Sequence, residues 1–291
     1  MLQKATEIVF ATDFSDSSHA IIPTVAQWVE SLGAKLTILH VYNPKKTLYR
    51  EAEARLRSFF AEADNYRHCD RVLVGGDPCD GIASYCESRS NLMLMLPPSD
   101  LSGLPRPWHR SMRARLIQRL TIPIWTVGKV NVGESAPTSN QNIGVWLGDP
   151  EEGISHLQHA AAYASEIGGT LHLLHVVDEI NEGSMLKPLL STAPMGLETA
   201  NGWVRDLVGT LELGCNFEVH VAQGRVALEF PGLLHRSGAN MLILSQQSAV
   251  HSTLIGLEIN PVFRGCPISL VCVPFGARME ELHRQVAESA A

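Results

Sequence analysis

The sequence lacks the patterns by which membrane proteins and several enzyme classes are recognised. No apolar run approaches the roughly 18 residues of a membrane helix. The chain enters its first apolar strand at Ile8 without a secretory hydrophobic segment. It contains no Walker loop, G-x-G-x-x-G turn, nucleophile elbow or H-E-x-x-H helix. We therefore predict no membrane segment and no catalytic residue.

Cysteine pairs at metal-binding or redox spacing are also absent. None of the six cysteines forms a C-x-x-C motif, and some lie inside apolar runs. This pattern favours buried, reduced thiols in a cytoplasmic protein. Cys79 and Cys86 fall on a similar face of one predicted helix, where a redox role would need a lowered thiol pKa. Inert thiols are the simpler interpretation.

The composition has no strong excess of charge. Charged residues form 18% of the chain and the net charge is −7, so neither nucleic acid nor an anionic membrane is favoured as a partner. With 291 residues, 45% of them hydrophobic, the chain is typical of a globular protein. At roughly 150 residues per domain, this length predicts about two domains.

What the sequence does contain is an internal repeat. Ile8–Val41 aligns without a gap with Ile143–Val176, 135 residues later. The shared positions include the helix-ending glycines Gly33 and Gly168 and the Leu-His-Val that closes each segment. A repeat that holds two strands and the helix between them indicates two copies of one domain.

The later parts of the two copies also correspond. Asn91–Leu96 aligns with Asn240–Ser245, and residues 122–127 align with 266–271. Each copy thus has five apolar runs separated by helix-length segments, which predicts two tandem doubly wound, Rossmann-like α/β domains, each with a five-stranded parallel sheet. The later helices are predicted over 47–64, 80–89, 111–120, 155–167, 197–213 and 227–236, with a weaker helical stretch around 252–264.

The repeat and the polar segment between its copies predict the domain boundaries. We expect a first domain at 1–128, a linker at 129–142, a second domain at 143–276 and a C-terminal helix or tail at 277–291. The last strands, 122–127 and 266–273, are expected to form the seam between the domains, since their apolar edges would otherwise be exposed.

Together these features resemble the universal stress protein (UspA-like) family in its tandem form. The resemblance rests on Ala-Thr-Asp-Phe-Ser at 11–15, the helix closed by Gly33, the repeated Leu-His-Val, Gly-Asp-Pro at 76–78 and the terminal Pro-Ile strands. It covers nearly the whole chain. It implies a fold similar to adenine nucleotide alpha hydrolases, a role in stress response, a pseudo-dimer of the two domains and a homodimer of two chains.

Members of this family that bind ATP carry a glycine-rich loop after the fourth strand, and this chain departs from it. Glycines let backbone N–H groups close on phosphates at the start of a helix. Here Leu96, Pro97 and Pro98 follow the fourth strand of the first copy, and Ser245 stands at the first glycine position of the second. Because proline removes a donor and side chains obstruct close approach, no cofactor is expected, with ATP or AMP as the alternative ligand.

The resemblance implies candidate nucleotide-binding residues in the first copy. Asp13 matches the family's acid near the adenine and ribose, with Thr12 and Val41 beside it. Arg110 and Ser111 stand where the phosphates would lie. The alternative for Asp13 is a helix-capping role.

Arginines crowd the region of the missing glycine loop, with no acidic residue between 101 and 133. Their guanidinium groups could replace backbone amides as donors to an anionic ligand. The simpler interpretation is a solvated helix face paired with acids elsewhere. The cluster consists of Arg106, Arg110, Arg113, Arg115 and Arg119.

The histidines offer weaker signals. His156 and His159 lie one helical turn apart, but no Cys, Asp or Glu completes a convincing metal site, so none is predicted. His40 and His175 recur at the same strand end, which favours a shared structural or site-lining role. His172 and His175 alternate onto opposite faces of their strand and cannot easily chelate together.

The sequence leaves three functions open. The first is a non-enzymatic stress-response protein that acts through a bound ligand or a protein partner. The second is a nucleotide-binding switch or weak ATPase that uses the first copy. The third is a carrier of a small lipid or metabolite, held in a cavity left by the missing phosphate loop.

Overall fold

The computed structural model describes residues 5–66, 68–98, 112–127, 142–148, 153–177, 197–211, 214–253, 256–264 and 266–274. The strands are β1 Glu7–Ala11, β2 Lys35–Tyr42, β3 Cys69–Gly75, β4 Leu92–Met95, β5 Ile124–Val127, β6 Asn142–Trp146, β7 Thr170–Val177, β8 Asn216–Gln223, β9 Met241–Ser245, β10 Val250–Thr253, β11 Gly256–Ile259 and β12 Ser269–Val273. The helices are α1 Asp16–Ala20, α2 Ile22–Leu32, α3 Tyr49–Ser58, η2 Ala61–Asn65, α4 Pro78–Glu87, α5 Met112–Arg119, α6 Gly153–Ile167, α7 Leu197–Leu211, α8 Val226–Ser237, α9 Gln246–Ala249 and α10 Pro261–Arg264.

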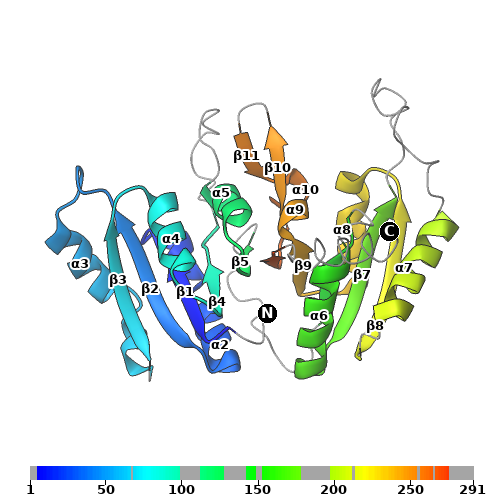
Figure 1. The fold of residues 1–291 in the computed structure, drawn as a ribbon, viewed down its shortest axis with the longest axis horizontal. Helices are drawn as coiled ribbons and strands as arrows, with labels where there is room; N and C mark the ends of the chain where they lie inside the picture. Colours follow the sequence, from blue (N-terminus) through cyan, green and yellow to red (C-terminus); the bar gives the residue numbers. More distant parts are fainter. Residues whose placement is uncertain are drawn as a thin grey trace, which may run out of the picture.

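One sheet runs through the whole molecule. Its ten strands follow the order β3-β2-β1-β4-β5-β12-β9-β6-β7-β8 (Figure 1). The pairs within each group of five are parallel, and β5 pairs with β12 in the antiparallel sense. The predicted doubly wound, five-stranded parallel sheets are therefore confirmed, and so is the seam. Joining the two edges satisfies backbone groups that each half alone would leave open.

Helices cover both faces of this sheet because its strands are apolar on both sides. On β1, Ile8 and Phe10 face one buried cluster while Val9 and Ala11 face the other. The first cluster packs against α2, α3, α6 and α7. The second packs against α4, α5, α8, α9 and α10. Among the described residues no helix is long and apolar enough to cross a bilayer.

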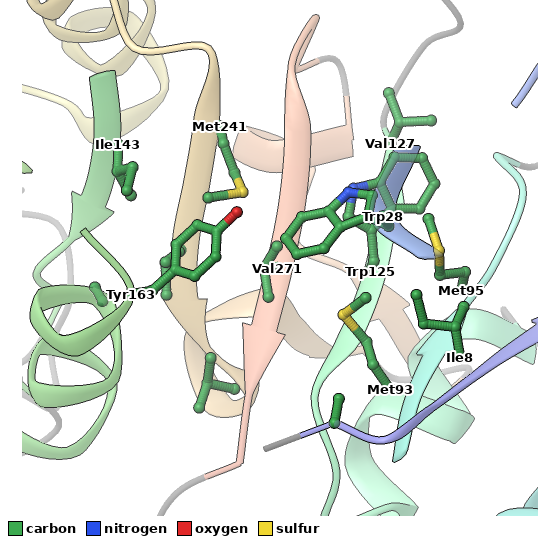
Figure 2. Packing of buried hydrophobic residues seen from close by; sticks show 14 of the residues in the cluster. Ile8, Trp28, Met93, Met95, Trp125, Val127, Ile143, Tyr163, Met241 and Val271 are labelled. Atoms are coloured by element: carbon green, nitrogen blue, oxygen red, sulfur yellow. The ribbon is translucent and has the colours of Figure 1, made fainter. Parts of the chain in front are cut away.

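The two halves meet about an approximate two-fold axis at the seam. Val271 pairs directly with Trp125, and the pairings of β5 and β12 with their neighbours place these two residues at equivalent positions of the repeat. Trp28 and Tyr163, which are also equivalent, stack across the seam with centroids 5.8 Å apart and planes 18° apart (Figure 2). Equivalent residues in mutual contact are the mark of an isologous interface.

The strand pairings correct the sequence alignment of the later segments. Ile8 pairs with Met93 and Ile143 pairs with Met241, so Met93 is the counterpart of Met241, one place from the predicted alignment. The last strands shift by two places. A short run of apolar residues buried on both faces carries little register information, and such an alignment slips easily.

The predicted helix over 47–64 is broken in the structure. It divides into α3 and η2, because Phe59 is extended and Phe60 adopts a left-handed φ of 51°. Both phenylalanine side chains are buried. Consecutive residues of a helix cannot point the same way, and the break lets both rings enter the core.

The helical stretch predicted around 252–264 is wrong over most of its length. Residues Val250–Thr253 and Gly256–Ile259 form an antiparallel hairpin, and only Pro261–Arg264 is helical. Asn260 ends the hairpin: its backbone N–H donates to the Ala249 carbonyl and its side-chain amide donates to the Ser248 carbonyl. The β-branched residues Val250 and Thr253 at the two ends of the first strand suit a strand.

Several predictions fall outside the described residues. Of the predicted linker 129–142, only Asn142 is described, and it opens β6. The predicted tail at 277–291 is not described.

The six cysteines are all free thiols. Burial raises the pKa of Cys79, and it raises the pKa of Cys86 to about 12, which agrees with inert thiols.

Candidate functional site

The turn between β1 and α1 forms the base of the candidate site. Thr12 is buried, and its hydroxyl accepts a hydrogen bond from the Phe14 N–H at 3.0 Å. Asp13 Oδ1 accepts from the Ser15 N–H at 3.0 Å and from the Ser18 hydroxyl at 2.7 Å. Ser15 in turn caps α1 by accepting from the Ser18 N–H. The side chain that caps α1 is thus that of Ser15, while Asp13 stabilises the turn before the helix.

The second carboxylate oxygen of Asp13 remains open. Oδ2 makes no hydrogen bond to a described residue, and the side chain is exposed. Partial burial raises the pKa of Asp13, but the hydrogen bonds from Ser15 and Ser18 outweigh it and lower the pKa below its usual value. The carboxylate is thus ionised at neutral pH, with one oxygen bound in the turn and the other available to a ligand.

Phe14 is held in a strained conformation beside Asp13. Its φ of 63° is rare for a bulky residue. Its ring packs on His40 at a centroid distance of 4.1 Å, on Phe59 at 5.4 Å and under the Arg55 guanidinium at 4.8 Å. Strain of this kind is found at binding sites and persists only when neighbours enforce it. The sequence showed Phe14 as part of a motif but not that its backbone is strained.

His40 and His175 make the same contact in the two halves. Nδ1 of His40 donates to the Thr12 carbonyl at 2.8 Å, and Nδ1 of His175 donates to the Leu147 carbonyl at 2.8 Å. Thr12 and Leu147 are equivalent positions directly after β1 and β6. Burial lowers the pKa of both imidazoles. Each neutral histidine therefore connects the end of its strand to the end of the neighbouring strand by a hydrogen bond, in agreement with the predicted structural role.

Val41 lies at the carboxyl end of β2, close to the Asp13 turn. It follows Leu39 by two residues, and Leu39 pairs with Ala11 at the end of β1. Helix α4 approaches it closely: a Cβ on Gly81 would lie 2.9 Å from both Val41 methyl groups. Thr12 and Asp13 therefore follow β1 at its boundary with β4, where the strand order reverses, and Val41 lies on the other side of β1 at the same carboxyl edge of the sheet. Ligands of open α/β sheets bind at such points.

The predicted phosphate side of this site is only partly described. Arg106, Arg110 and Ser111 lie outside the described residues. Leu96 is buried at the end of β4, and Pro97 and Pro98 follow it. By the corrected register, Pro97 is the counterpart of Ser245. A proline there supplies no N–H group to a phosphate.

Two members of the arginine cluster bind protein groups. Arg113 is buried and donates to the Thr126 hydroxyl at 3.0 Å and to the Val127 carbonyl at 3.1 Å. Arg119 pairs with Glu87 at 2.8 Å and with Asp80 at 3.0 Å. Arg119 matches the expected pairing with acids, whereas Arg113 anchors α5 to the seam strand.

In the second half, the corresponding strand end is part of the contact between the halves. Ser245 is buried and caps α9 by accepting from the Ser248 N–H at 2.9 Å. Gln246 then reaches across the seam, and its amide donates to the carbonyls of Leu120 at 2.9 Å and Ile122 at 3.1 Å. The β10–β11 hairpin lies against α5 of the first half (Figure 1). Side chains and helix α9 thus fill the place of a phosphate loop.

The histidine pair on α6 has a structural role in part. Nε2 of His156 lies 2.7 Å from the Trp146 carbonyl, and the side chain is buried. A ring nitrogen engaged in this way is not available to a metal. Burial and the neighbouring His156 lower the pKa of His159. Neither residue belongs to a group of potential metal ligands among the described residues.

An apolar cavity of about 430 Å³ opens between α8 and α10. It lies at the amino ends of β9 and β12, the edge of the sheet opposite the strand ends discussed above. The predicted carrier cavity at a missing phosphate loop is therefore not where this cavity is found. Its lining includes Phe230, Leu234, Val262, Cys266 and Ile268.

Comparison with solved structures identifies the fold. The chain resembles a universal stress protein from Archaeoglobus fulgidus DSM 4304, with a TM-score of 0.68 and 15% identity over 94% of this chain and 100% of that one. A functionally unknown protein from Pseudomonas aeruginosa PAO1 matches with a TM-score of 0.62 and 13% identity, covering 99% of each chain. A Pseudomonas aeruginosa UCBPP-PA14 protein, assigned only provisionally to the universal stress proteins, matches with a TM-score of 0.58 and 14% identity over 97% and 98%. No family model matches the sequence, and no curated protein does.

Proposed function

We propose that this chain is a tandem universal stress protein that acts in stress response by binding a ligand or a protein partner, without catalysing a reaction. The fold similarity over the full chain supports the assignment, and so does the internal repeat. We propose residues 1–128 and 143–276 as its two domains. We also propose that the protein is cytoplasmic. We further propose that it pairs with a second copy, and light scattering on the purified protein tests this pairing.

The observation that carries this proposal is the replacement of the phosphate loop in the second half. Ser245 uses its hydroxyl to cap α9, and Gln246 donates both contacts to carbonyls of the first half. A phosphate cradle needs several free backbone N–H groups and no side chain in the way. Here the backbone continues into α9 and the hairpin, which pack on α5. The strand end therefore serves cohesion between the halves rather than anion binding.

The test is a titration of the purified full chain with ATP and with AMP by calorimetry, together with an assay for ATP hydrolysis. We expect no hydrolysis and no micromolar ATP binding. Micromolar ATP binding that Asp13→Ala abolishes and Asp16→Ala preserves would overturn the proposal. Asp16 is a suitable control because it is an exposed acid at the start of α1, three residues after Asp13.

A second candidate function, a nucleotide-binding switch or weak ATPase in the first half, is favoured by the geometry around Asp13. The open Oδ2 oxygen, the strained Phe14 and the position of Val41 at the carboxyl end of β2, next to β1, suit an adenosine group. Thr12, Asp13 and Val41 would contact the nucleoside, and Arg110 and Ser111 would contact the phosphates.

The relative affinities of AMP and ATP separate these possibilities. If only the nucleoside side of the site is retained, AMP and ATP bind equally weakly. If Arg110 and Ser111 complete a phosphate site, ATP binds more tightly than AMP, and Arg110→Ala removes that difference while leaving AMP binding unchanged.

A further inference from the structure

Three side chains that the sequence did not connect meet on the outer strands of the second half. His172 lies on β7, and Glu218 and His220 lie on the neighbouring edge strand β8. His172 pairs with Glu218, and His220 pairs with Leu174, two residues from His172. Since side chains alternate along a strand, all three project from the same face of the sheet, the face that α8 covers.

The donor atoms of this group are spaced as metal ligands are. Nδ1 of His172 lies 3.0 Å from Nε2 of His220. The Glu218 Oε2 atom lies 3.6 Å from the first nitrogen and 3.7 Å from the second. Metal–ligand distances of about 2.0–2.1 Å at the tetrahedral angle place donor atoms about 3.3 Å apart. The observed triangle brackets that value and closes with small rotations of the side chains.

The three side chains differ in their exposure to solvent, from a buried histidine to an exposed carboxylate. The His172 side chain is 6% exposed, that of His220 is 17% exposed and that of Glu218 is 63% exposed. A surface cavity beside β8 is lined mainly by residues of α7 and β8, which include Glu218 and His220 but not His172. The exposed Glu218 carboxylate gives an ion access from solvent, and a water molecule could complete its coordination.

The first half does not share this feature, so it is not a property of the fold. The equivalent positions are Thr37, Asp70 and Val72. Thr37 donates to Glu7 at 2.6 Å, and Asp70 forms an ion pair with Lys35. These groups provide no imidazole and no free carboxylate. The three donors belong to the second half alone.

We propose that His172, Glu218 and His220 form a binding site for Zn²⁺ or a similar borderline divalent ion. Two imidazoles and one carboxylate are a donor set that zinc accepts, with water in the fourth position. Hard ions such as Mg²⁺ and Ca²⁺ prefer oxygen ligands and are excluded by the two nitrogens. Because a proton joins the two nitrogens when no metal is bound, the ion takes the place of that proton, which moves to the far nitrogen of its ring.

Two features set the expected affinity. Nε2 of His172 is buried without a hydrogen-bond partner among the described residues, so no carbonyl or carboxylate orients this ring from behind. Such second-shell partners typically contribute 10- to 100-fold in affinity, roughly. The Arg236 guanidinium also lies close enough to act electrostatically on His220. We therefore expect a micromolar site rather than one that retains zinc through purification.

The test is calorimetric titration of Zn²⁺ into the full chain, without an affinity tag and stripped of metal. One ion per chain is expected. Glu218→Gln and His220→Asn should each weaken binding by about tenfold or more, while circular dichroism confirms that both variants fold. The matched controls are Glu198→Gln and His235→Asn, which change exposed residues of the same half and should bind zinc as the unchanged chain does.

Cobalt identifies the donor atoms. Co²⁺ bound by nitrogen and oxygen ligands in tetrahedral geometry absorbs in the visible, without the intense near-ultraviolet band of thiolate coordination. A thiolate band would place the ion on a cysteine such as Cys215, which lines the same surface cavity, and would overturn the proposal. Equal zinc binding by Glu218→Gln and His220→Asn would do the same, as would the absence of binding by the folded, unchanged chain.

Discussion

At the scale of single residues, the hydrogen bonds of His40 and His175 explain why a histidine recurs at this position although the surrounding sequence of the two copies has diverged. In both halves a neutral imidazole ties the second strand to the carbonyl that follows the first strand. A buried carbonyl without a donor is costly, and in each half the imidazole supplies that donor. The repeat therefore preserves a structural contact, not a catalytic one.

This contact predicts how stability depends on pH. The pKa values of His40 and His175 are lowered from 6.5 in the folded protein, so the unfolded chain binds these protons more tightly. The free energy of unfolding is then at its full value above about pH 6.5 and falls as the pH decreases through and below that value. Replacing His175 with Gln removes one of these protons from the balance.

We expect His175→Gln to flatten the decline in stability on acidification, measured by urea unfolding at a series of pH values. The decline persists in part, because His40, His159 and His220 also have lowered pKa values. His235→Gln, which changes an exposed histidine of the same half, is measured alongside as the control. An unaltered slope in His175→Gln would show that this imidazole is not neutralised by burial.

Two variants of Asp13 separate the contribution of its hydrogen bonds to stability from that of its charge. Asp13→Ala removes the acceptor for the Ser15 N–H and the Ser18 hydroxyl and should cost about 1 kcal/mol in unfolding free energy. Asp13→Asn keeps an oxygen at Oδ1 and should retain most of that stability. Both values come from urea unfolding at neutral pH. A large loss in the asparagine variant would mean that the charge, rather than the hydrogen bonds, stabilises the turn.

At the scale of elements, the segment after β9 shows how a strand end changes its role. α9 and the β10–β11 hairpin leave the second half and pack on α5 of the first. The first half has Leu96, Pro97 and Pro98 at the related place, and its following residues are not described. At the positions where the family resemblance predicts a phosphate loop, the second half therefore has a capped helix and a hairpin, and the first half begins with two prolines.

A Gln246 variant tests how much this contact between the halves contributes to the free energy of unfolding. Gln246→Ala removes the donor to the Leu120 and Ile122 carbonyls and should lower the unfolding free energy by about 1–2 kcal/mol. Its neighbour Gln247 is exposed, and Gln247→Ala should stay within about 0.5 kcal/mol of the unchanged chain. Thermal unfolding of both variants makes the comparison. Equal stability of the two would mean that the bonds across the seam are not needed.

At the scale of the whole molecule, the seam makes one body of two repeats. The sheet continues from one half into the other through the β5–β12 pair. On one face of the sheet, Trp28 and Tyr163 add a second contact between the halves by stacking their rings (Figure 2). Since buried residues of both halves belong to the same clusters on each face, we expect calorimetry to show a single unfolding transition.

Tyr163 provides a sharper test of the seam. Its ring is buried against Trp28, but its hydroxyl has no hydrogen-bond partner among the described residues, and burial raises its pKa. Tyr163→Phe keeps the stack and removes an unsatisfied buried group, so stability should be unchanged or higher. Tyr163→Ala leaves a cavity and should cost about 3–5 kcal/mol. Destabilisation by the phenylalanine variant would reveal a partner for the hydroxyl.

The features predicted well are those that depend on local pattern. Helices such as 155–167 and 197–213 match α6 and α7 within two residues, because apolar periodicity and terminal glycines specify a helix locally. Aligning Gly33 with Gly168 identified a common helix end, and both have a positive φ. Polar contacts between side chains distant in the chain were missed. The alternation that separates His172 from His175 is correct, but the partner of His172 comes from another strand.

The sequence by itself determined the duplication, the parallel sheets, the covered faces and the seam, since each follows from apolar spacing that repeats along the chain. Only the tertiary structure decided which polar groups meet. It brought Glu218 and His220 to His172 across a strand pair and turned Gln246 toward the carbonyls of Leu120 and Ile122. Contacts of a few ångströms between distant residues depend on strand register, and a one-residue shift in register reverses which side chains share a face.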